Sequence, residues 1–170
     1  ALGVAIGSWL SAYFILVTNA FMQHPVGHSI GADGRLQLAD FGAYLGNPWA
    51  WIQFAHNQCS TVATASFVVA AVGAFWMLRG EHEAMARCFL RLGVRAGLVS
   101  SVLVAFPTGD LHAKMVAKHQ PVALAAMEGR FETGPMAELN MIGQPNVKER
   151  RLDNPLPVPG VLSFLAFGTA

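Results

Sequence analysis

Uninterrupted apolar runs dominate the first two thirds of this chain. The first run covers residues 1–23, "ALGVAIGSWLSAYFILVTNAFMQ", and holds no charged residue. A second run covers about 49–78 and a third about 85–106. A membrane-spanning helix needs about 20 mostly apolar residues, whereas a long helix of a soluble protein normally shows a polar stripe. The pattern therefore predicts three transmembrane helices.

The pattern changes after residue 108. The stretch "HQPVALAAMEGRFET" predicts a short amphipathic helix that begins at Pro121, because the fixed φ of proline suits the first helical turn. Its predicted faces hold Leu124, Met127 and Phe131 on one side and Glu128 and Glu132 on another. Residues 134–160 are rich in proline and polar residues and predict an extended loop. We therefore expect an all-α membrane helical bundle over 1–108, and an extracytoplasmic segment over 109–170.

The arginines indicate which side of the membrane each connection occupies. Arg79, Arg87 and Arg91 surround the connection between the second and third runs, whereas residues 24–48 contain only Arg35. Short cytoplasmic loops carry an excess of Lys and Arg. We therefore predict that the connection at Arg79–Arg91 is cytoplasmic and that residues 24–48 lie outside.

Composition supports a membrane protein and argues against other classes. Hydrophobic residues make up 54% of the chain and charged residues 12%, about half of the roughly 25% typical of soluble domains. A net charge of +1, with no basic stripe, argues against nucleic-acid binding. Cys59 and Cys88 lack metal-binding spacing and are expected to be packing residues. Because the chain starts and stops inside apolar runs, we expect it to be an internal piece of a longer protein.

A histidine inside a predicted membrane helix is the main candidate site. His56 lies about eight residues, roughly 12 Å, into the second helix, where an ionisable group is costly and is by default a functional candidate. Ser60, Ala63 and Thr64 follow on its face, with Phe67 beyond them. Such small side chains leave a slot for a haem whose iron the imidazole would bind. A neutral histidine bonded to another helix, or one on an ion or proton path, fits the same pattern.

Other polar and small residues in the apolar runs indicate cofactor or helix contacts less specifically. Ser11, Thr18 and Asn19 suit either cofactor contacts, a water chain or interhelical hydrogen bonds. Small residues at four-residue spacing predict close helix contacts. These residues are Gly3, Gly7 and Ser11 in the first helix and Gly93, Gly97 and Ser101 in the third.

Charged residues near the third helix repeat at regular spacing. Arg87, Arg91 and Arg95 recur every four residues; the first two suit anchors at the inner interface, while Arg95 is deeper and needs a partner such as a carboxylate or a haem propionate. The remaining histidines are interpreted as solvated loop residues: His24, His28, His82, His112 and His119.

Three stretches together resemble the larger subunit of cytochrome bd-type quinol oxidases. "GSWLSAYFILVTNAFMQHPVG" is similar to the fourth membrane helix of that family and "NPWAWIQFAHNQCS" to the fifth. Gly109–Asp110 and "HQPVALAAMEGRFET" resemble the segment between the sixth helix and the quinol loop. The resemblance covers essentially all 170 residues, and "QPVALAAMEG" looks closest to the cyanide-insensitive branch. Ala123 departs from the family, which commonly has a lysine in this tract.

The resemblance implies that His56 is an axial ligand of a low-spin haem b, and that Ser11 and Asn19 line the haem and proton-delivery region. With Ser60 and Thr64 from the spacing argument, these are the candidate cofactor-binding residues. The complete enzyme would oxidise quinol and reduce dioxygen to water through this haem, a further haem b and a haem d. Its partners would be the rest of the large subunit, a second oxidase subunit and membrane lipid.

The implied location is the bacterial inner (cytoplasmic) membrane, as a multi-pass protein, and the piece alone is expected to be inactive. The alternative is a non-catalytic membrane module such as a transporter fragment, in which His56 and Arg95 lie near a substrate path. A transporter would show a second half with matching interrupted helices. A soluble all-helical binding protein is a third possibility, which extraction without detergent would reveal.

Overall fold

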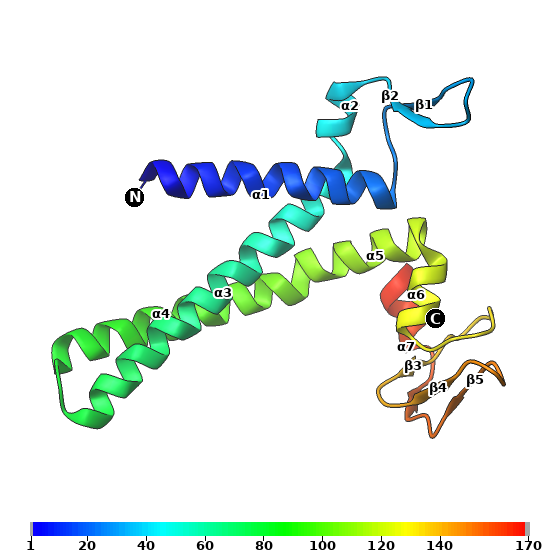
Figure 1. Cartoon of the computed structure of the whole chain (residues 1–170). Helices are drawn as coiled ribbons and strands as arrows, with labels where there is room; N and C mark the ends of the chain where they lie inside the picture. Colours follow the sequence, from blue (N-terminus) through cyan, green and yellow to red (C-terminus); the bar gives the residue numbers. More distant parts are fainter. Residues whose placement is uncertain (1, 169–170) are drawn as a thin grey trace. The chain divides into compact units, whose positions relative to one another are not determined.

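The computed structural model describes residues 2–168 of the chain. The chain divides into two compact units, Ala1–Gly109 and Asp110–Ala170, each with its own architecture. Three long helices form the first unit (Figure 1): α1 (Leu2–Gln23), α3 (Pro48–Arg79) and α4 (Glu83–Leu103). They match the three predicted helices to within a few residues, and Ala1 lies outside the described residues.

The ends of α3 follow from its sequence. Asn47, which is fully buried, accepts a hydrogen bond from the backbone N–H of Trp49 at 3.0 Å through its side-chain oxygen, and so caps the helix. Pro48 occupies the first helical position, where its missing N–H costs nothing. At the other end Gly80 has φ 66°, the left-handed conformation in which helices commonly stop.

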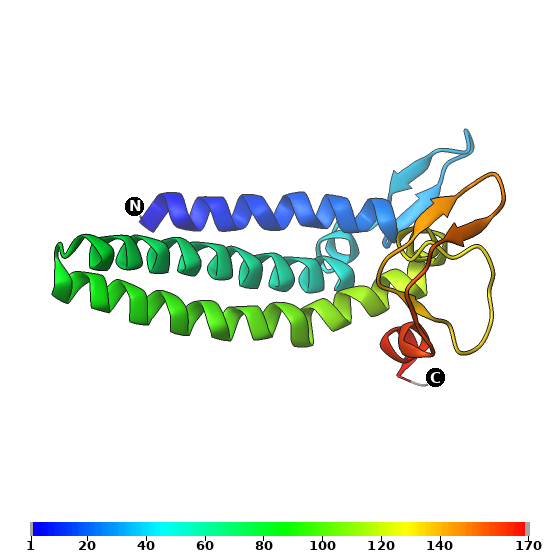
Figure 2. The ribbon, with the colours of Figure 1, turned by 90° about the horizontal axis from the view of Figure 1, so that it is seen from below.

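α3 and α4 lie side by side along most of their lengths, joined by a short turn (Figures 1 and 2). The contact runs through small residues, as predicted for α4. A Cβ atom added to Gly93 would lie 2.5 Å from the carbonyl oxygen of Ser66, and one added to Gly97 3.2 Å from the Phe67 ring. Ser100, rather than the predicted Ser101, is the buried hydroxyl residue of this face.

The small residues of α1 do not make such a contact. An added Cβ at Gly3 or Gly7 would meet nothing within 4 Å, and Ser11 is exposed. Within the described chain the prediction of a close contact on this face is therefore wrong. α1 packs on α3 instead through larger side chains, with the ring centroids of Tyr13 and Trp51 4.6 Å apart.

The connection from α1 to α3 contains short regular elements. Strands β1 (His28–Ile30) and β2 (Leu36–Leu38) form an antiparallel hairpin, and α2 (Phe41–Leu45) follows. The Asp40 carboxylate accepts a hydrogen bond from the Ala43 N–H at 2.9 Å and so caps α2.

Among residues 2–168, three helical stretches are long and apolar enough to cross a membrane, one in each of Leu2–Gln23, Phe41–Arg79 and Glu83–His119. Between 11% and 17% of each apolar window is buried inside the structure. Large side chains such as Leu78, 88% exposed, and Leu98, 64% exposed, therefore present apolar surface outward. Surfaces of this kind fit lipid or further membrane helices.

The second unit contains three short helices among its described residues, where the sequence predicted one. These are α5 (Asp110–His119), α6 (Pro121–Met127) and α7 (Val161–Phe167). The predicted amphipathic helix does begin at Pro121, but it ends at Met127 because Gly129 adopts φ 61°. Phe131 and Glu132 therefore lie outside the helix, and their predicted faces are wrong.

Residues 134–160 form hairpins rather than a wholly extended loop. Two antiparallel pairs are present, β3 (Leu139–Asn140) with β6 (Pro157–Val158), and β4 (Gln144–Asn146) with β5 (Arg151–Asp153). Strands of two or three residues are too short to give an alternating pattern in the sequence.

The β4–β5 hairpin is expected to loosen at acidic pH. Hydrogen bonds from the Asn146 amide at 3.2 Å and from the Arg151 guanidinium at 2.7 Å hold the pKa of the Asp153 carboxyl below its usual range. A depressed folded-state pKa stabilises the hairpin above the ordinary aspartate value of about 3.9, and this stabilisation is lost as the pH falls through the folded pKa. Hydrogen exchange of residues 144–153 should become faster as the pH falls through the folded pKa of Asp153. In Asp153→Asn this increase should be absent. Identical pH profiles for both proteins would contradict this.

Candidate functional site

His56 lies half-buried on α3 and reaches a segment 52 positions away in the sequence. Its Nδ1 is 3.2 Å from Oγ1 of Thr108, which belongs to η1 (Val104–Gly109), the kinked segment after α4. α3 and α4 pack against each other along most of their lengths, as Figure 2 shows, and this pairing brings the two residues together. The histidine ring is thus within hydrogen-bond distance of a side chain from the segment that follows α4.

The local structure of η1 gives this contact its form. Pro107 stands inside the turn and Phe106 has non-helical backbone angles, so the regular helical ladder is broken there. The Thr108 hydroxyl donates to the carbonyl of Leu103 at 2.6 Å. A Cβ at Gly109 would lie 3.7 Å from Cε1 of His56, so the imidazole lies close to the backbone here.

Ser60 and Thr64 follow His56 on the same helix, as predicted. Their hydroxyls donate back to the carbonyls of His56 and Ser60, at 2.9 and 3.0 Å. With these polar groups bonded to the helix, the side chains add little bulk beside the histidine. Phe67, further along α3, places its ring over Gly97 of α4.

Asn19 and Ser11 are placed differently from each other. Asn19 donates a hydrogen bond from Nδ2 to Oε1 of Gln53 at 3.2 Å, and Gln53 is 5% exposed. Because Gln53 precedes His56 by three residues, Asn19 is tied to the helical turn next to the histidine. Ser11 lies eight residues before Asn19, roughly 12 Å along α1, and is exposed. The structure thus brings Asn19, but not Ser11, toward His56.

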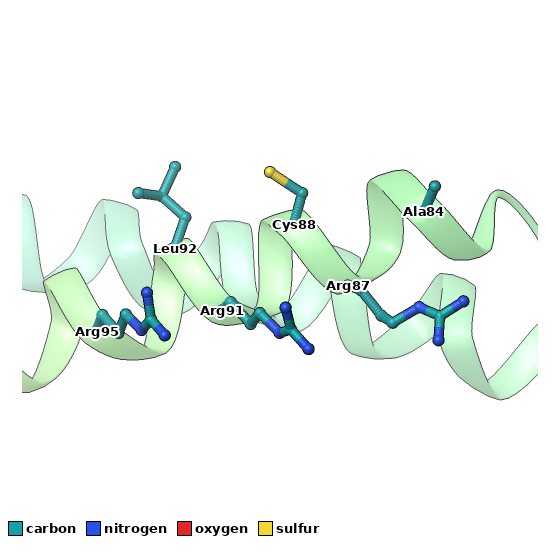
Figure 3. Close-up of a pocket in the computed structure, with 6 residues that line it drawn as sticks. All are labelled: Ala84, Arg87, Cys88, Arg91, Leu92 and Arg95. Carbon is teal, nitrogen blue, oxygen red and sulfur yellow. The ribbon is translucent and has the colours of Figure 1, made fainter.

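The three regularly spaced arginines lie along one side of α4 (Figure 3). They line an open groove together with Ala84, Cys88 and Leu92. Arg87 bonds to Glu83 at 2.9 Å, an exposed i, i+4 pair. Within residues 2–168, Arg91 and Arg95 form no ion pair, so the partner expected for Arg95 is not found there.

The prediction that five further histidines are solvated loop residues is wrong in part. His112 and His119 are half-buried members of α5. His24 is half-buried, and its carbonyl accepts a hydrogen bond from the Asn47 amide at 3.1 Å. The His82 ring lies 5.6 Å from that of Trp76. His28 is exposed, on β1.

The described residues contain no group of three or more His, Cys, Asp or Glu side chains that could hold a metal ion. Cys59 and Cys88 are both free thiols; Cys59 is half-buried, whereas Cys88 is exposed and does not pack within the described residues as predicted.

The known proteins that this chain is similar to belong to one family. The sequence model of the family described as cytochrome bd terminal oxidase subunit I matches residues 1–170. The cytochrome bd ubiquinol oxidase subunit 1 of Bacillus subtilis (strain 168) is 33% identical over 165 residues, which cover 96% of this chain and 35% of that protein. The cytochrome bd-II ubiquinol oxidase subunit 1 of Escherichia coli (strain K12) is also 33% identical over 165 residues, 96% of this chain and 32% of that protein.

The fold agrees with a solved structure. The bd oxidase from Geobacillus thermodenitrificans matches with a TM-score of 0.85 and 34% identity, over 99% of this chain and 38% of that one. The chain therefore spans about a third of the length of the curated relatives it matches.

Proposed function

The chain belongs to the cytochrome bd terminal oxidase subunit I family, and we propose that it forms the part of such a subunit that holds a low-spin haem b through His56. The observation that carries this proposal is an imidazole within a membrane-length helix whose Nδ1 is engaged by Thr108 at 3.2 Å. Iron-binding histidines usually bond through one ring nitrogen to the metal and through the other to a fixed partner.

The residues around His56 fit a haem. Ser60 and Thr64 keep their hydroxyls bonded to α3 and add little bulk, and Gly109 lacks a side chain next to the ring. A flat macrocycle needs such a surface beside its ligand. We propose Ser60 and Thr64 as residues that contact the haem, with Asn19 supporting the adjacent turn through Gln53 and Ser11 further along α1.

In this proposal residues of this chain bind the haem, orient the ligand ring and shield the site from water. His56 would hold the haem through a ring nitrogen, Thr108 would fix the ring, and the apolar surfaces of α3 and α4 would keep water from the site. A bound haem b would supply one-electron redox chemistry, with a potential set by its axial ligands and their hydrogen bonds.

For the whole protein we propose a multi-pass enzyme of the bacterial inner membrane that oxidises quinol and reduces dioxygen to water. It would use a further haem b and a haem d, and would contain the rest of the large subunit, a second oxidase subunit and bound lipid. Family membership favours this over a transporter fragment. Because this chain offers one haem ligand, we expect it to be inactive without the rest of the enzyme.

The experiment that tests the proposal is removal of the imidazole in the complete enzyme. If His56 binds the low-spin haem, the spectroscopic signal of that haem depends on it, whereas an exposed histidine such as His28 can be replaced without effect. A low-spin signal equal in both variants would overturn the proposal.

The proposed membrane orientation has a separate test. We expect a cysteine at Asp33, in the β1–β2 turn, to react with a membrane-impermeant maleimide from outside, and one at Glu81, in the α3–α4 turn, to react only after permeabilisation. Both positions are exposed. The background would carry Cys59→Ser and Cys88→Ser. The reverse labelling pattern would contradict an external 24–48 connection.

A further inference from the structure

We propose that Thr108 is a positioning residue that fixes the tautomer and ring orientation of His56, so that Nε2 presents its lone pair to a metal. This inference rests on the proposed function of His56 as a haem ligand. It concerns a residue that the sequence analysis did not single out.

The hydrogen-bond distances around the Thr108 hydroxyl determine the direction of each bond. Oγ1 lies 2.6 Å from the carbonyl oxygen of Leu103, 3.2 Å from Nδ1 of His56 and 3.4 Å from the carbonyl oxygen of Val104. A hydroxyl has one hydrogen to donate and two lone pairs. Carbonyl oxygens can only accept, so the hydrogen goes to Leu103 at the shortest distance.

The Thr108 hydroxyl oxygen must then accept a hydrogen bond from Nδ1 of His56. Nδ1 is therefore the protonated nitrogen, because an unprotonated Nδ1 would face the lone pairs of Oγ1 at 3.2 Å. In the neutral ring this leaves the lone pair on Nε2, the nitrogen that points away from Thr108. Neutral imidazole with one free lone pair is the form that binds iron.

The broken helical ladder of η1 holds the threonine in place. Pro107 has no N–H to give to the preceding turn, which leaves carbonyl oxygens near residue 103 in need of a donor. The hydroxyl of Thr108 meets that need and so is anchored at one end by the backbone. Its other contact, with His56, therefore has little rotational freedom. A serine would keep both bonds, whereas a valine of the same shape would lose both.

Loss of the Thr108 hydroxyl as hydrogen-bond acceptor should change the basicity of the His56 imidazole. An acceptor on the Nδ1 hydrogen increases the basicity of the other nitrogen, which favours the ferric state of a bound iron. Replacing the hydroxyl by a methyl group should therefore shift the iron equilibrium toward the ferrous state and raise the midpoint potential. It should also release the ring orientation.

The test compares Thr108→Val with Thr108→Ser in the purified complete oxidase, by redox titration of the low-spin haem b and by electron paramagnetic resonance of its ferric state. We expect the valine variant to favour the ferrous state by about three- to tenfold, where tenfold equals about 59 mV for one electron, and to have altered g values. The serine variant should match the native enzyme in both readouts. Both variants should still contain the low-spin haem.

The outcomes separate this inference from the proposed function. A valine variant with native potential and native g values would overturn the role of Thr108 while leaving His56 as ligand. Equal shifts in the valine and serine variants would also overturn it, since the hydroxyl would then not be the cause. If the valine variant does not assemble, Thr108→Cys, whose thiol is a weak acceptor, replaces it with the same expected shift. Failure of the proposed function would show instead as a low-spin signal that survives without His56.

Discussion

A complete oxidase that carries His56→Ala is expected to lack the low-spin haem b band in its reduced-minus-oxidised spectrum. The methyl group of alanine cannot bind iron. Quinol oxidation should fall by about 100-fold or more, beyond the 10- to 100-fold typical of changes in a ligand's hydrogen-bond partner. Signals from the other haems should remain.

His28→Ala is the matched control, because His28 is exposed on β1 and takes no part in the proposed site. It should keep the native spectrum and activity. A His56→Met variant adds a graded case, since methionine also serves as a haem ligand and raises the potential. It should retain a low-spin haem at a higher potential. Persistence of the native band in His56→Ala would show that another residue binds this iron.

The second large effect is expected from Gly93→Ala, which should destabilise the α3–α4 pair by about 1–3 kcal/mol, as overpacking of a tight core does. The added Cβ would lie 2.5 Å from the carbonyl oxygen of Ser66 and 2.6 Å from the backbone nitrogen of Ala70. Both are backbone atoms that cannot rotate away, so the helices must separate. Thermal unfolding of the purified complex and its haem-to-protein ratio would measure the loss.

Two further glycine substitutions calibrate this result. Gly97→Ala should cost less, because its nearest neighbour is the end of the Phe67 ring at 3.2 Å, which can shift. Gly3→Ala should leave the α3–α4 pair unaffected, because no described atom outside its own helix backbone lies within 4 Å of the new methyl group. Equal stability of the Gly93 and Gly3 variants would contradict the close packing of α3 on α4.

The secondary structure was predictable where the apolar pattern was long. The three spanning helices were predicted to within a few residues. A charged residue is costly in lipid whatever its neighbours in space are, so the composition of each stretch is enough to identify a span. The cap of α3 also follows from local chemistry, since "NP" provides a side-chain oxygen and a first-turn proline. The short strands of residues 134–160 were not predicted, because their pairing depends on partners rather than on local pattern.

The candidate site was predictable only in part. A histidine in an apolar run stands out in any sequence, so His56 was found directly. Thr108 was missed, although a threonine between Pro107 and Gly109 inside an apolar helix is a recognisable sign of a broken helical ladder. Asn19 was interpreted either as a cofactor contact or as an interhelical bond, and the structure contains the second of these, to Gln53.

The sequence by itself determined that this chain forms three membrane-length helices with one histidine set among apolar residues. Both properties depend on composition along a single helix. Only the tertiary structure decided which small residues pack, Gly93 and Gly97 but not Gly3, and which hydroxyl meets the imidazole. Contacts between residues 52 positions apart depend on the rotation and register of α3 against α4, which the packing of side chains along both helices fixes together.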